Sequence, residues 1–94
     1  MAYLYAVQST SRPYGPSENI PDSAWSQVSR HTSLVAACRR YLRELATMHQ
    51  AVGARCWNAH YRIVALGSAP SPHIAHAYDA QAVIDDAHAT RRVA

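Results

Sequence analysis

The strongest constraint on the fold is an apolar repeat of three and four residues in the middle of the chain. This spacing places side chains on one stripe of an α-helix, and it is shared by Leu34, Cys38, Tyr41, Leu42, Leu45, Met48 and Val52. We therefore predict a helix over about 33–52, with Thr32 or Ser33 as its N-cap. Such a helix has to bury its stripe against another layer, so the remaining chain must supply that layer.

Short apolar segments on both sides of this helix predict the other layer. Residues 2–8 are apolar and aromatic on both faces, and residues 57–66 alternate, with Tyr61 and Ile63 on one face. Residues 24–30 fit either a strand or a short helix capped near Asp22. We favour the strand, because residues 2–8 need a hairpin partner.

The C-terminal third predicts a fourth short strand over 73–78 and then a short helix over 80–90, with Asp79 as its N-cap. The expected fold class is α+β: a small antiparallel sheet of three or four strands packed on the long amphipathic helix, with the short C-terminal helix on the same face. Residues 1–94 form a single domain. Residues 9–23, rich in Pro and Ser, form a long loop within it.

The charge of the chain is unevenly distributed. All nine basic residues are Arg, and with six acids they give a net charge of +3; residues 1–62 hold seven Arg but only three acids. This excess suits a polyanionic or acidic partner, although it is too small for a protein that coats DNA. The absence of Lys and the abundance of Ala indicate a GC-rich bacterial or phage genome.

The basic residues of the helix are the first candidate site. Arg39, Arg40 and Arg43 fall on the polar side of the 33–52 helix, where Arg39 and Arg43 lie one turn apart. A guanidinium pair at this spacing suits a phosphate or a carboxylate. Glu44, four residues after Arg40, is a candidate to neutralise Arg40, and a merely solvated helix face is the alternative interpretation.

The second candidate site is the polar face of the 57–66 strand, with His60 and Arg62. Small metal-independent ribonucleases of the toxin type use such residues around the scissile phosphate. A zinc site from Cys56, His60, His73 and His76 is not expected, because Cys56 and His60 would lie roughly 13 Å apart along a strand. We expect no cofactor, and Cys38 is a core residue.

The segment from Val28 to Leu42 superficially resembles the turn and recognition helix of a helix-turn-helix DNA reader. It lacks the turn glycine that lets two such helices cross closely. A capped amphipathic helix is therefore the favoured interpretation.

These observations favour a non-catalytic small binding protein that occupies a surface of a larger partner. The expected partner is a host protein or ribonucleoprotein complex, contacted through Arg39, Arg40, Arg43, His60 and Arg62. A phage or mobile element that encodes a defence inhibitor, of the anti-CRISPR type, fits this size and composition. A nucleic-acid-binding regulator that uses the Arg face, or a small ribonuclease, is the alternative. We expect a cytoplasmic protein of a bacterial host, with no membrane span and with a surface that also suits a homodimer.

Overall fold

The computed structural model describes residues 2–10, 20–52, 60–68, 70–74 and 76–93, and for residues 49–52, 60 and 91–93 it describes the backbone alone. The elements follow in the order β1, η2, β2, α1, β3 and α2, where η2 is a single 3-10 turn. Their bounds are Tyr5–Thr10, Asp22–Ala24, Ser26–His31, Leu34–Val52, His60–Ala65 and Ala77–Val93. This part of the chain is a small α+β fold, as predicted.

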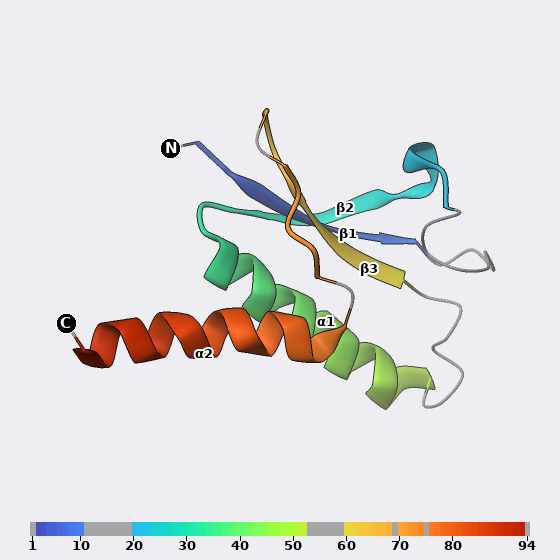
Figure 1. Cartoon of the computed structure of the whole chain (residues 1–94). Helices are drawn as coiled ribbons and strands as arrows, with labels where there is room; N and C mark the ends of the chain where they lie inside the picture. Colours follow the sequence, from blue (N-terminus) through green and yellow to red (C-terminus); the bar gives the residue numbers. More distant parts are fainter. Residues whose placement is uncertain (1, 11–19, 53–59, 69, 75, 94) are drawn as a thin grey trace.

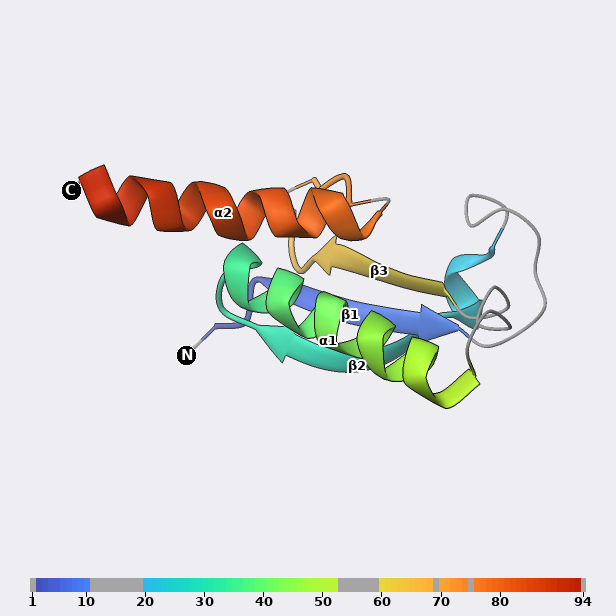
Figure 2. The ribbon, with the colours of Figure 1, turned by 90° about the horizontal axis from the view of Figure 1, so that it is seen from below.

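Strand β1 forms the centre of the sheet, whose order is β2-β1-β3. Both neighbours pair with β1 in the antiparallel sense, so β2 and β3 run in the same direction on either side of it. Both helices lie on one side of the sheet (Figure 1), and α1 contacts all three strands. Helix α2 packs beside α1, on the β3 side of the molecule (Figure 2).

The core lies between the sheet and α1 and is centred on Val7 of β1, which is 0% exposed. The buried residues around it come from both helices and from β3: Ala37, Cys38, Tyr41, Ile63, Ala80 and Ile84. Ala6 is also 0% exposed, although it points to the opposite face of the sheet. Arg30 and Val64 lie on either side of it in register, so its small side chain is covered by larger neighbours.

Helix α1 confirms the predicted 33–52 helix to within one residue. The backbone N–H of Ala36 donates to Ser33 Oγ at 3.2 Å, which makes Ser33 the N-cap. Cys38 and Tyr41 of the predicted stripe are buried, and Leu34, Leu42 and Leu45 pack partly buried against them. In the described part of the chain, no helix combines the length and the apolar character that crossing a membrane requires.

The strand predictions hold with shifted bounds. The strand expected over 2–8 begins at Tyr5 and continues to Thr10, because the partners of its last residues lie on β3. The segment 24–30 supplies most of strand β2, which spans Ser26–His31, while Ala24 belongs to the turn η2. The predicted loop 9–23 is shortened at both ends. Residues 57–59 and 11–19 lie outside the described residues. Strand β3 ends before Gly67, whose φ of 100° suits glycine.

The prediction for the C-terminal third was wrong in three respects. Ala77 and Tyr78 belong to α2, so they do not form the end of a strand over 73–78. Helix α2 is also not short, because it has 17 residues. Asp79 lies in its first turn, where its carboxylate accepts the N–H of His76 at 2.9 Å and its own N–H donates to the His76 carbonyl. This pair of bonds starts the helix earlier than expected.

The segment from Val28 to Leu42 contains a capped amphipathic helix, as favoured from the sequence, and is not a helix-turn-helix. The element that precedes α1 is the strand β2, whereas a helix-turn-helix requires a helix at this position. The turn of residues 32–33 therefore joins a strand to a helix.

The packing of the core predicts which apolar residues carry the stability. Ile63→Ala should lower the free energy of unfolding by about 2–5 kcal/mol, because Ile63 is 3% exposed and its truncation leaves a cavity beside Val7. Leu4→Ala, at a side chain 50% exposed, should cost about 1 kcal/mol or less. Denaturant unfolding of both variants measures this difference, and equal losses would contradict the position given to Ile63.

Candidate functional site

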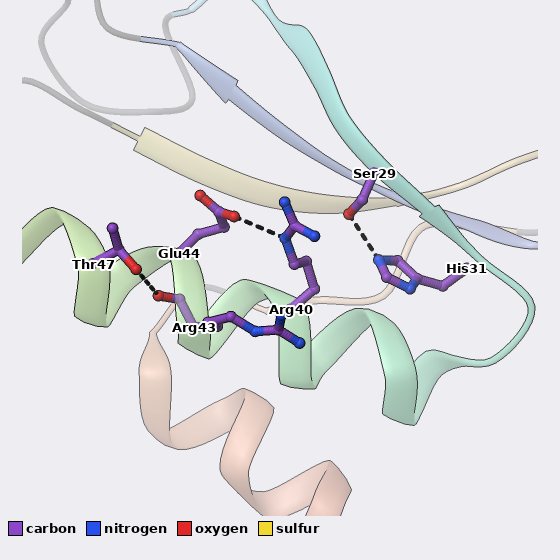
Figure 3. Close-up of polar contacts among 6 residues, drawn as sticks. All are labelled: Ser29, His31, Arg40, Arg43, Glu44 and Thr47. Carbon is purple, nitrogen blue, oxygen red and sulfur yellow. Dashed lines mark hydrogen bonds and ion pairs between the residues drawn. The ribbon is translucent and has the colours of Figure 1, made fainter.

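The three arginines of α1 do not form one continuous face. Arg39 is exposed and donates from Nη2 to His88 Nε2 of α2 at 3.1 Å. Arg40 extends toward the sheet and donates from Nε to Glu44 Oε1 at 2.7 Å, which confirms the predicted pairing (Figure 3). Arg43 is exposed. The helix thus presents Arg39 and Arg43 to solvent and directs Arg40 toward β2.

Two residues of β2 face Arg40 on the helix side of the sheet. Ser29 and His31 are separated by one residue, so their side chains share a face of the strand. Ser29 Oγ and His31 Nε2 are hydrogen-bonded at 2.7 Å. Figure 3 shows the guanidinium of Arg40 between the Glu44 carboxylate and this Ser29–His31 pair. We call Ser29, His31 and Arg40 the β2–α1 site.

The electrostatic environment of His31 is positive. Burial lowers the pKa of His31, and the charges of Arg40 and Arg43 lower this pKa further. The imidazole is therefore held in its neutral form more firmly than an exposed histidine, and a neutral ring offers one nitrogen as an acceptor. The Ser29 hydroxyl lies beside that ring, and the tautomer of the imidazole decides whether Ser29 Oγ donates or accepts.

Burial raises the pKa of two other groups near this site, Tyr61 and Cys38. The pKa of the Tyr61 hydroxyl is raised by burial and by the Glu44 carboxylate, so it stays protonated. Burial also raises the pKa of the Cys38 thiol, which lies on the buried side of α1. A protonated, buried thiol is a poor nucleophile, so Cys38 has the core role predicted for it.

Arg62, predicted as a binding residue, is engaged within the protein on the other face of the sheet. Its Nε donates to Gln8 Oε1 at 2.8 Å, and its Nη1 lies 3.3 Å from Asp22 Oδ1. Its guanidinium also lies over the ring of Trp25, 4.4 Å from the centroid. Arg62 thus ties η2 and the start of β2 to the sheet. For His60, the predicted neighbour of Arg62, the structure describes the backbone only.

Metal ligands do not gather in the part of the chain that the structure describes. Among these residues, no group of three or more His, Cys, Asp or Glu could hold a metal ion. His73 and His76 are both exposed, and His76 stacks on Tyr78. Cys56, another residue of the zinc hypothesis, lies outside the described residues.

Sequence reasoning missed Ser29 and His31 as site residues. The available signal was the spacing Ser-x-His at the end of a segment with strand character. It was weak because the strand or helix state of residues 24–30 was undecided, and on a helix the same two side chains would point apart.

The contacts of Arg62 predict a structural role for this side chain. Arg62→Ala should lower the free energy of unfolding by about 1–2 kcal/mol, because the cation–π contact and the bond to Gln8 are both lost. Arg30→Ala is the matched control: Arg30 also lies over an aromatic ring, that of Tyr3, but is exposed. It should cost about 0.5 kcal/mol. Thermal unfolding measures both, and equal costs would contradict the role of Arg62.

The lowered pKa of His31 predicts a pH dependence of stability. As the pH falls, the unfolded chain protonates this imidazole before the folded protein does. The contribution is therefore complete above the ordinary histidine pKa and decreases as the pH falls through and below that pKa. His31→Asn should remove this part of the decrease in unfolding free energy, and Arg43→Gln should reduce it. Arg39→Gln, whose charge is not among the causes, should leave it unchanged. Urea unfolding at several pH values measures the slope, and an unchanged slope in His31→Asn contradicts the prediction.

Comparison with known proteins assigns no family. No protein-family model matches the chain, and no match was found among curated proteins or among solved structures. Support for a function therefore comes from the contacts and charges of this chain.

Proposed function

We propose that this protein is a non-catalytic binding protein that docks the exposed basic face of α1, carrying Arg39 and Arg43, onto an anionic surface of a larger partner. The observation that carries this proposal is the charge balance of α1. Its only carboxylate, Glu44, is bound to Arg40 at 2.7 Å. The charges of Arg39 and Arg43 are thus not neutralised by an acid of their own helix.

The rigid support of this face favours binding. Helix α1 contacts all three strands on one side and α2 along another, so the backbone that carries Arg39 and Arg43 is fixed before a partner arrives. A preorganised surface loses less conformational entropy on association than a flexible one. Exposed guanidinium groups also accelerate the encounter with an anionic partner and form bidentate bonds with its carboxylates or phosphates.

The kind of partner follows from the composition and remains a prediction. A host protein or ribonucleoprotein fits a basic, single-domain binder from a GC-rich bacterial or phage genome, and inhibition of a host defence complex is the activity that we expect. Direct contact with nucleic acid beside this face is the second candidate. The observation that favours it is the position of the Ser29 hydroxyl and the His31 imidazole next to Arg40.

The intramolecular contacts of Arg62 remove it from the proposed surface. Its guanidinium contacts Gln8, Asp22 and Trp25, so a partner would have to displace bonds that hold η2 to the sheet. A ribonuclease site that depends on a free Arg62 is disfavoured for the same reason. We therefore place the binding surface on the side of α1.

Charge reversal on α1 should abolish binding and leave the fold intact. In an affinity pull-down from bacterial lysate, the double variant Arg39→Glu/Arg43→Glu should lose the partner that the wild-type protein captures. The expected loss is about 2–5 kcal/mol of binding free energy, since the partner's charges are left unpaired. Circular dichroism should show an unchanged fold, because exposed substitutions cost about 0.5 kcal/mol or less.

The control for this experiment is Arg30→Glu, at an exposed arginine of β2 whose side chain lies on the face of the sheet away from the helices. It changes the net charge in the same direction but should retain the partner. Capture by the double variant equal to that of the wild type would refute the proposed surface.

A further inference from the structure

The β2–α1 site brings hydrogen-bond donors together from two elements. Ser29 and His31 come from the edge strand β2, and Arg40 comes from α1, which packs across the sheet. The side chain of Arg40 is 34% exposed, and Ser29 and His31 are half-buried. Solvent-borne groups therefore reach all three side chains, while the two elements hold them in place.

The outer nitrogens of Arg40 are available for a ligand. Its Nε is bound to Glu44, and within the described residues the structure has no hydrogen bond to either of its terminal amino groups. Figure 3 shows these amino groups on the side of the guanidinium that faces Ser29. A half-buried guanidinium with two free amino groups beside a hydroxyl and an imidazole is suited to an oxyanion.

We propose that Ser29, His31 and Arg40 bind a phosphate group, of the phosphodiester kind that nucleic acid presents. The inference rests on the proposed function, because it names the anionic group that the partner places beside the basic face of α1. The donors favour phosphate over carboxylate by their arrangement. They approach from a strand and from a helix, and therefore from different directions, which matches a tetrahedral anion better than a planar one.

Binding of the anion is coupled to the proton of His31. The groups that face this imidazole are Arg40 and Arg43 from α1, Tyr5 opposite it on β1, and Ser29 on its own strand. A bound phosphate offsets the two guanidinium charges, so the imidazole takes up a proton. Its Nε2–H then donates to Ser29 Oγ, and the hydroxyl hydrogen of Ser29 is free to donate to the phosphate. Affinity therefore rises as the pH falls.

The test is fluorescence anisotropy of a labelled single-stranded oligoribonucleotide with the full chain. Ser29→Ala and Arg40→Lys should each weaken binding roughly tenfold, the effect of one hydrogen bond to a charged group. Thr47→Ala is the matched control, because the Thr47 hydroxyl donates to the backbone carbonyl of Arg43 at 3.0 Å instead. It should change the affinity less than about twofold.

Two further measurements exclude loss of fold as the explanation. Glu44→Gln should tighten binding roughly threefold, because it removes the carboxylate that competes for Arg40, and a misfolded protein would not gain affinity. Wild-type affinity should rise between pH 8 and pH 6, where the phosphodiester does not titrate, and His31→Asn should abolish this rise. Unchanged affinity in Ser29→Ala and Arg40→Lys, or no gain in Glu44→Gln, overturns the inference.

The outcomes separate this inference from the proposed function. If Ser29→Ala binds RNA more weakly while Arg39→Glu/Arg43→Glu captures the partner normally, the phosphate site is supported and the proposed surface is refuted. If the double variant loses the partner while Ser29→Ala binds RNA normally, the proposed surface is supported and the phosphate site is refuted. If the wild-type protein binds a polyglutamate peptide more tightly than the oligoribonucleotide, the site is assigned to acidic protein and the phosphate inference is overturned.

Discussion

The packing of β1 against α1 is the interaction on which the rest of the structure depends. Val7, at the centre of β1, is fully buried against Cys38 and Tyr41 of α1. Because β1 is also the only strand that pairs with both others in the described sheet, this contact joins all three strands to the helix. Helix α2 then adds Ala80 and Ile84 to the same core. In a domain this small, one cluster has to supply most of the apolar burial.

The same packing divides the polar residues between two faces with different roles. Arg62 lies on the face of the sheet away from the helices and binds Gln8, Asp22 and Trp25 there, so its charge serves the fold. Arg40 lies on the helix side, where its Nε is bound, but none of the described residues binds its outer nitrogens. Both are half-buried arginines of similar exposure. Their neighbours, and not their burial, decide which one is available to a ligand.

The positive charge around His31 determines how anion binding at the proposed site depends on pH. Arg40 and Arg43 disfavour a third positive charge on the imidazole. An anion that approaches the two guanidinium groups removes this penalty, so that anion binding and proton uptake favour each other. Glu44 limits the effect, since it already neutralises Arg40 in part. The free protein thus tolerates Arg40 and Arg43 close together, and both guanidinium groups still attract a bound anion.

The sequence by itself determined α1 and its stripe with Cys38 and Tyr41, because a period of three and four residues over a long segment has one structural solution. It narrowed the N-cap to Thr32 or Ser33, of which the structure selects Ser33, and the strand segments predicted the α+β class. It also predicted the Arg40–Glu44 pair, a contact within one helix. The extent of α2, with Asp79 in its first turn, was missed, since helix ends depend on a few capping bonds. Only the tertiary structure decided that Arg62 is engaged and that Ser29 and His31 face Arg40. These arrangements involve β2, β3, η2 and α1, and the distances between separate elements are set by packing that no local pattern encodes.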